Sequence, residues 1–172
     1  TIMNILTGYL AATSGQVTVA GHPLPQEADA AKACVGYLPE QPPLYFDMTV
    51  YEYLSFVYDL KKVKNDKKAH IEHVMELVQI SDMQGRMIKN LSKGYKQRVG
   101  LAQALVGNPK VLILDEPMNG LDKDGVEDMR KYLLDLKAQG KTILIASHSA
   151  EDINVLCDTV CEMDKGKLEK IR

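Results

Sequence analysis

The sequence predicts an α/β fold with a mostly parallel sheet, a small antiparallel part and an inserted helical subdomain. Two short apolar runs, residues 111–114 and 143–146, each lead into polar residues, which is typical of parallel strands buried on both faces. Between residues 49 and 106 the apolar residues recur at helical spacing instead, with no strand pattern among them. This order of patterns predicts helices inserted into an α/β core.

The N-terminal part is predicted to contain a helix, a hairpin and a buried strand. Residues 2–6 have helical spacing and run into Thr7-Gly8, so we expect the chain to begin inside a helix, as a piece of a longer protein. Residues 14–21 alternate polar and apolar side chains between glycines, the pattern of a half-exposed strand in an antiparallel hairpin. Residues 35–38 read as a buried strand, which the prolines within residues 39–43 bring to an end.

Three helices are predicted in the middle of the chain. Thr49 and Glu52 match a capping box, in which each side chain satisfies a backbone N–H of the first turn. Apolar stripes then predict helices over residues 67–78 and 93–106. We expect a single domain, residues 1–172, with an α/β core in 1–41 and 108–172 and a helical subdomain in 42–107.

The last part of the chain alternates helices and strands. Residues 122–137 are predicted to form a helix that stops at Gly140, and residues 142–146 a second buried strand. Ser149 and Asp152 match a second capping box, which places His148 between the end of a strand and the start of a helix. Residues 159–171 read as a β-hairpin.

Asp115 and Glu116 directly follow the buried strand at residues 111–114. Two adjacent carboxylates at the edge of a buried strand repel each other and are costly to desolvate, so we expect a compensating group. Magnesium with phosphate oxygens would serve, because Mg²⁺ prefers one or two carboxylates plus substrate phosphates. Asp115 would then help to hold the metal and Glu116 would orient or deprotonate an attacking water; the alternative is an acidic turn that caps the next helix.

The composition argues against several classes of protein. The net charge of −2, without a dominant basic surface, argues against binding to duplex nucleic acid. No apolar run approaches the roughly 20 residues that span a bilayer. The three cysteines do not suit a disulfide framework, which favours a reducing cytoplasm; zinc is the alternative to a structural role for Cys157 and Cys161. Residues 61–68 are rich in lysine, which indicates either a solvated turn or a contact with anionic lipid headgroups.

Several polar groups lie at predicted strand or helix ends, where ligands bind in open α/β sheets. In chain order they are Glu40-Gln41, residues 91–95, Asp115-Glu116, residues 120–122 and His148. With residues 91–98 (LSKGYKQR) followed by Asp115-Glu116-Pro117, the sequence resembles the nucleotide-binding domain of ATP-binding cassette (ABC) transporters, most of all the single-domain kind of ABC-2 type exporters. The resemblance implies a P-loop NTPase (RecA-like) core, ATP and Mg²⁺ as cofactors, and ATP hydrolysis.

The resemblance implies a role for each matching residue. Glu116 and His148 would be catalytic, and Asp115 would bind the metal. Residues 92–94 open a helix whose free N–H groups and dipole suit a phosphate, and in the family this signature meets ATP bound by a second copy of the domain. The residues that would contact nucleotide are Thr1, Glu40, Gln41, Ser92, Lys93, Gly94 and Asp122. The alternatives are plain helix caps at Ser92 and Asp122 and a structural role for His148.

The sequence departs from the family pattern in three places. Lys93 and Tyr95 stand where glycine and glutamine are common in the signature. Glu40 occupies the Q-loop position and Gln41 follows it, so either could hold the metal through water. The glycine-rich Walker A loop is absent, and Thr1 resembles the residue just after its serine; the resemblance thus implies a chain truncated within Walker A that is inactive alone.

The resemblance also implies partners and a location. The domain would lie at the cytoplasmic face of the cell membrane, pair with a second ATPase domain and bind an integral membrane permease, not nucleic acid. Residues 45–58 hold most of the aromatic side chains, and we expect Tyr53 and Phe56 to lie off the buried stripe of their helix. The six are Tyr45, Phe46, Tyr51, Tyr53, Phe56 and Tyr58. We therefore expect the permease's coupling helix near residues 42–58, with an aromatic core of the subdomain as the alternative.

Two other functions stay open from the sequence. A soluble ABC ATPase that acts on ribosomes or DNA would share these motifs. A non-catalytic fragment would explain the missing Walker A loop, but it would have no evident use for Asp115, Glu116 and His148.

Overall fold

A parallel sheet of three strands forms the centre of the molecule. The computed structural model describes residues 1–172, and its sheet has the order β3 (Val35–Leu38), β4 (Val111–Asp115), β5 (Thr142–Ala146). Both pairings are parallel. Two separate antiparallel hairpins complete the β structure, β1 (Val17–Val19) with β2 (His22–Leu24) and β6 (Cys161–Asp164) with β7 (Lys167–Lys170). The predicted α/β class, with a parallel sheet and a small antiparallel part, is confirmed.

The middle strand, β4, is covered on both faces. Leu112 and Leu114 belong to the larger hydrophobic core, whereas Ile113, between them, belongs to a smaller one on the opposite face. The smaller core is formed with α1 (Ile2–Leu6), α2 (Ala28–Cys34) and the β1–β2 hairpin. Helix α2 was not predicted, because its sequence, ADAAKAC, has no stripe of large apolar side chains and buries only Ala31.

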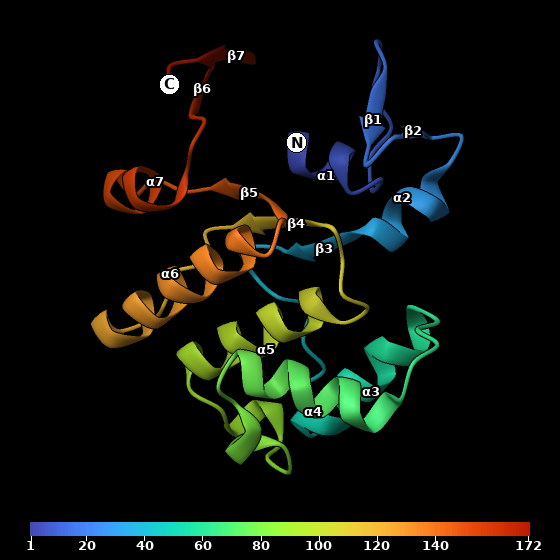
Figure 1. Ribbon diagram of the computed structural model, residues 1–172, viewed down its shortest axis with the longest axis vertical. Coiled ribbons are helices and arrows are strands. Elements are labelled where there is room, and N and C mark those ends of the chain that lie inside the picture. Colours follow the sequence, from blue (N-terminus) through green and yellow to red (C-terminus); the bar gives the residue numbers. More distant parts are fainter.

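The helical part lies on one side of the sheet. It consists of α3 (Val50–Leu60), α4 (Lys67–Leu77), α5 (Lys93–Leu105) and two short 3₁₀ turns, Ser81–Met83 and Ile88–Asn90. Figure 1 shows these helices at the bottom of the view, while the hairpins and both termini lie at the top. The capping box of Thr49 and Glu52 is present. Ile71 of α4 and Leu112 of β4 belong to the same core, so the hydrophobic interior is continuous across the proposed subdomain boundary.

The prediction that residues 142–146 are buried is wrong. After α6 (Lys123–Ala138), β5 forms an edge of the sheet and contains no fully buried residue. Ile143 and Ile145 pack against the larger core, but Leu144 is 39% exposed on the opposite face. The smaller core, which covers that face of the sheet, is built around β3 and β4, so β5 extends beyond it.

The aromatic residues of the helical part are divided between core and surface. Tyr53 is only 3% exposed and its hydroxyl donates to the carbonyl of Pro43 at 3.2 Å, so the expectation that it lies off the buried stripe is wrong. Tyr53 packs inward because α3 is covered by the residues 42–46 loop as well as by α4 and α5. Tyr45, Phe46 and Phe56 are 49%, 52% and 38% exposed. The rings of Tyr45 and Phe56 have centroids 5.4 Å apart. These two side chains, together with the exposed ring of Phe46, which follows Tyr45 in the chain, are called the aromatic patch.

The lysine-rich segment 61–68 is largely engaged within the chain. The Nζ of Lys61 donates to the carbonyls of Gln103 and Val106 at the end of α5, at 3.2 and 2.9 Å. Lys67 pairs with Asp59, and Lys68 with Glu72 in the next turn of α4. Favourable contacts of cations with a helix C-terminus explain at least Lys61 without a lipid.

The three cysteines are free. Cys34 and Cys157 are half-buried and Cys161 is exposed. No three His, Cys, Asp or Glu side chains cluster closely enough to hold a metal ion by themselves. None of the helices is both long and apolar enough to cross a bilayer.

His70 gives the helical part a dependence on pH. Its Nε2 accepts the Gly107 N–H at 3.0 Å, just after α5, so the ring must be neutral at that atom. Burial, followed by the nearby His73 and Lys61, lowers the pKa of His70 below its usual value. The unfolded chain therefore takes up a proton at higher pH than the folded chain, and stability is retained above about pH 6.5 but falls as the pH drops toward the folded-state pKa.

We expect His70→Gln to remove part of this acid sensitivity. A glutamine Oε1 can accept the same N–H but does not titrate. Urea unfolding at pH 7.5 and pH 5.5 measures the effect, with the parent losing more free energy of unfolding than the variant between the two values. Equal losses of free energy of unfolding in parent and variant would show that other groups cause the loss of stability at low pH.

Candidate functional site

The polar residues predicted at strand ends come together at one edge of the sheet. β3 ends before Glu40, β4 before Glu116, and β5 before His148. An open cleft at this edge is lined by Glu40, Glu116, Asn119, Ser147, His148 and Asp152. Because parallel strands have their carboxyl ends at the same edge, residues far apart in sequence line one cleft.

Glu116 and His148 contact each other directly in this cleft. The His148 N–H donates to Glu116 Oε1 at 3.0 Å, and the His148 Nε2 lies 3.7 Å from the same oxygen. The Glu116 side chain is 24% exposed, whereas the His148 ring is fully exposed. The loop backbone after β5 is thus held by the carboxylate, while the ring stays free to meet a ligand.

Glu116 has a left-handed backbone, with φ of 48°. This conformation is uncommon for residues other than glycine, and it persists only where surrounding contacts hold it. The Glu116 N–H donates to the Ala146 carbonyl of β5 at 2.9 Å. On the other side, Gln97 of α5 donates through Nε2 to the carbonyls of Glu116 and Pro117, at 3.4 and 3.3 Å. The backbone that carries the carboxylate is therefore fixed from two elements.

Gln97 is a buried polar residue beside the candidate site that the motifs in the sequence did not indicate. It is 4% exposed, one of only two buried polar residues in the chain. The sequence could have indicated that Gln97 is buried, because it falls on the inward stripe of its helix together with Leu101 and Ala104. A buried amide needs partners, and those partners proved to be the carbonyls beside the carboxylate pair.

Asp115 ends β4 with its side chain half-buried. No hydrogen bond or ion pair within the chain engages its carboxylate. Burial and then the charge of Asp115 raise the pKa of the Tyr37 hydroxyl. An unpartnered, half-buried carboxylate beside Glu116 fits a Mg²⁺ ion that takes its remaining ligands from phosphates and water.

The predicted signature residues lie at the start of α5, outside the lining of the cleft. Ser92 is the N-cap, and its Oγ accepts the Tyr95 N–H at 3.3 Å. The Lys93 Nζ donates to Asn119 Oδ1 at 3.2 Å, and its aliphatic chain lies where a Cβ on Gly120 would sit. Since Asn119 also lines the cleft, Lys93 links the signature to the strand-end residues.

The remaining predicted site residues lie at helix N-termini or in the loop after β3. Asp122 is the N-cap of α6, and its Oδ1 accepts the Gly125 N–H at 3.0 Å. Glu40 lines the cleft, whereas Gln41 is exposed and is not part of its lining. Thr1 is exposed at the N-cap position of α1. At Gly94 an added Cβ would find only ordinary contacts, 3.6 Å from the Gly120 carbonyl oxygen, so packing within the chain does not require glycine there.

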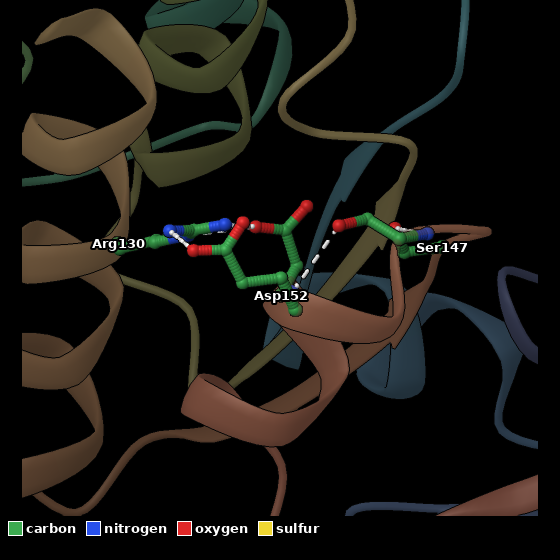
Figure 2. Close-up of polar contacts among 5 residues, drawn as sticks. Arg130, Ser147 and Asp152 are labelled. Atoms are coloured by element: carbon green, nitrogen blue, oxygen red, sulfur yellow. Dashed lines mark hydrogen bonds and ion pairs between the residues drawn. The ribbon is translucent and has the colours of Figure 1, made fainter. Parts of the chain in front are cut away.

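The predicted second capping box is only half formed. Ser149 Oγ accepts the Asp152 N–H at 3.2 Å, but the Asp152 carboxylate does not return to the Ser149 backbone. It binds Arg130 of α6 instead, with Nε to Oδ1 at 2.7 Å. Figure 2 shows Arg130 facing Asp152 across the start of α7 (Ala150–Leu156), with Ser147 on the other side. A charged guanidinium is a stronger partner for a carboxylate than a neutral N–H, so the pairing between helices prevails.

The chain is similar to known proteins over nearly its whole length. The family model described as ABC transporter matches residues 1–119. The ABC transporter ATP-binding protein sll0415 of Synechocystis is 37% identical over 171 residues, which are 98% of this chain and 48% of that protein. The lantibiotic transport ATP-binding protein SrtF of Streptococcus pyogenes is 35% identical over 168 residues, 98% of this chain and 71% of SrtF.

A solved structure has the same fold. CbiO1 of Clostridium perfringens, part of the ABC transporter complex cbiONQ, superposes with a TM-score of 0.83 at 28% identity, covering 98% of this chain and 69% of that one. The chain spans about half the length of several curated relatives that it matches. With the family match, the shared fold and a relative of which it covers 71%, the chain belongs to the ABC transporter family as an ATP-binding domain.

Proposed function

We propose that this chain hydrolyses ATP as part of a full-length ATPase that drives transport through a separate membrane subunit. The observation that carries the proposal is the contact of Glu116 with His148, at 3.0 Å, beside the unpartnered carboxylate of Asp115. This arrangement combines a candidate general base, a polar group for the γ-phosphate and a candidate metal ligand at one sheet edge. A turn with a purely structural role would not explain why these three groups occur together.

In the proposed reaction, water attacks the γ-phosphorus of ATP and the bond to the β-phosphate oxygen breaks. Glu116 would accept the proton of the water, because its carboxylate is partly exposed to the cleft and its backbone is held by Gln97 and Ala146. His148 would donate from its exposed ring toward the γ-phosphate oxygens. Its backbone N–H would keep the Glu116 carboxylate oriented.

Asp115 is the residue that would hold Mg²⁺, and Glu40 is better placed than Gln41 to assist through water, since Glu40 lines the cleft. The bound ion would neutralise charge on the phosphates. The Walker A residues that the resemblance implies are not among residues 1–172, so the experiments require a protein in which they are supplied.

A second copy of the domain is proposed to complete the site. The N–H groups of Lys93 and Gly94 donate no hydrogen bond within the chain, so the start of the 13-residue helix α5 offers free donors. The glycine at position 94 is not needed by internal packing and would permit close approach of a phosphate. Because these groups do not line the chain's own cleft, nucleotide from a partner copy is their natural ligand.

The membrane partner is proposed to dock on the exposed aromatic patch of Tyr45, Phe46 and Phe56. The patch lies just beyond Glu40 in the chain, so docking there could be transmitted to the cleft. Aromatic side chains of this kind anchor protein interfaces. This position would place the domain at the cytoplasmic face of the membrane, with no role for nucleic acid.

We expect the double substitution of Tyr45 and Phe46 by alanine to abolish co-purification with the membrane subunit. Both rings are about half exposed, so the isolated domain should keep its fold and its basal ATPase activity. Affinity purification from detergent extracts measures the effect. Tyr9→Ala is the matched control, because Tyr9 is 80% exposed and lies outside the patch. Retention of the membrane subunit by the double variant would place the interface elsewhere.

ATP hydrolysis itself is tested by phosphate release from Mg-ATP by the full-length protein and its Glu116→Gln variant, which should be much slower. A parental protein without magnesium-dependent hydrolysis would overturn the proposed function.

A further inference from the structure

A buried ion pair joins helices α6 and α7 beside the candidate site. The Asp152 side chain is 6% exposed and that of Arg130 is 15% exposed. Arg130 donates from Nε to Asp152 at 2.7 Å and from Nη1 to Glu151 at 3.0 Å. A buried carboxylate without such a partner would be strongly destabilised, so Arg130 is what allows an aspartate at this position.

The ion pair continues directly into the loop that carries His148. The Asp152 N–H donates to Ser149 Oγ at 3.2 Å, and the Ser149 N–H donates to Ser147 Oγ at 3.1 Å. Between these two serines, the His148 N–H donates to Glu116. The backbone on both sides of His148 is therefore fixed by contacts that end at the Arg130 guanidinium. Figure 2 shows Arg130, Asp152 and Ser147 in this arrangement.

The two helices differ in how well they can hold a position. α7 has only seven residues, too few to be stable alone, so its orientation depends on tertiary contacts. α6 has sixteen residues and buries Met129, Leu133 and Leu136 against the core. Arg130, next to Met129, is thus a firm point against which the first turn of α7 can be fixed.

We infer that Arg130 is a positioning residue for His148: through Asp152 it sets the backbone of residues 147–149, and with it the contact of His148 with Glu116. The inference rests on the proposed hydrolysis at Glu116. Arg130 itself does not line the cleft and does not reach the reacting atoms. Its effect is on the geometry of the loop.

The same helix pair supplies a matched control. Nearer the C-terminal end of α6, the Lys137 Nζ donates to Asp158 Oδ1 at 2.6 Å and to the Leu156 carbonyl at 3.2 Å. These contacts also tie α6 to α7, but at the C-terminal end of α7, away from His148. Lys137→Met therefore weakens the contact between the two helices without disturbing the His148 loop, and so measures the effect of that weakening alone.

Turnover of the full-length protein tests the inference. Arg130→Met and Asp152→Asn should each lower kcat by about tenfold to a hundredfold, the scale expected when a catalytic group is misplaced by about 1 Å. Lys137→Met should stay within about twofold of the parent. Arg130→Lys should recover only part of the loss, because a single ammonium cannot bind Asp152 and Glu151 with the fixed fork of a guanidinium.

A double-mutant cycle separates positioning from general loosening. If Arg130 acts through His148, Arg130→Met should change the single-turnover rate by less than about twofold when His148 is already alanine. A full additional loss in that background would overturn the inference, as would equal rates for the Arg130→Met and Lys137→Met variants.

Amide hydrogen exchange gives a readout that does not depend on activity. Exchange in a peptide covering residues 147–152 should become at least about tenfold faster in Arg130→Met but not in Lys137→Met, since only the first releases the loop. Unchanged exchange would contradict the inference even if Arg130→Met were inactive. Absence of hydrolysis by the parent would instead refute the proposed function and leave the exchange result to decide on the loop.

Discussion

Glu116→Gln in the full-length protein is expected to slow ATP hydrolysis by roughly 10²–10⁴-fold, the usual contribution of a positioned general base. The substitution removes the basic oxygen but keeps an amide oxygen that can still accept the His148 N–H, which lies 3.0 Å from the carboxylate. ATP binding should therefore persist, and the ATP-bound dimer should accumulate. Phosphate release and size-exclusion chromatography with Mg-ATP measure the two effects.

The result that would count against this role is a Glu116→Gln variant with more than about a tenth of the parental rate. The role of base would then pass to His148, or catalysis would rest on positioning alone. Asp124→Asn is a suitable control, because Asp124 is an exposed carboxylate in the first turn of α6 and does not line the cleft.

Gly36→Ala is expected to destabilise the fold by about 3 kcal/mol or more, at the upper end of what overpacking costs. A Cβ at this position of β3 would lie 2.1 Å from the Ala104 carbonyl oxygen of α5 and 2.8 Å from the side chains of Leu112 and Pro109. The nearest atom belongs to the backbone, so no rotamer change can relieve the clash. Helix α5 would have to move away from the sheet, taking Gln97 with it.

Urea unfolding of Gly36→Ala beside Gly85→Ala measures this effect. A Cβ at Gly85 would meet nothing within 4 Å, so the second variant should match the parent within about 0.5 kcal/mol. Equal free energies of unfolding for the two variants would show that the contact between α5 and β3 can widen at little cost. The hydrogen bond from the Gln103 side chain to the Tyr37 carbonyl, at 2.6 Å, would be the first to weaken.

Local patterns in the sequence were sufficient for most of the secondary structure and for the family. The capping box at Thr49 and the stripes of α4 and α5 depend on residues three or four positions apart, so they can be recognised without knowing what packs on them. The run in β4 likewise predicted a strand covered on both faces. The positions of Glu116 and His148 at strand ends were predicted for the same reason, since a strand's end is a local event.

What only the tertiary structure decided was which distant groups meet. From the local sequence, the Asp152 carboxylate could equally well cap its own helix. It pairs instead with Arg130, 22 positions away, because a buried charge is stabilised most by an opposite charge. Tyr53 was expected to lie off the buried stripe of α3, but it is buried and its hydroxyl donates to the Pro43 carbonyl in the loop before the helix. The β5 run is as apolar as a buried strand, but its exposure depends on how far the smaller core extends over the sheet. In each case the outcome depends on desolvation and pairing between elements far apart in the chain, which periodicity along one element cannot report.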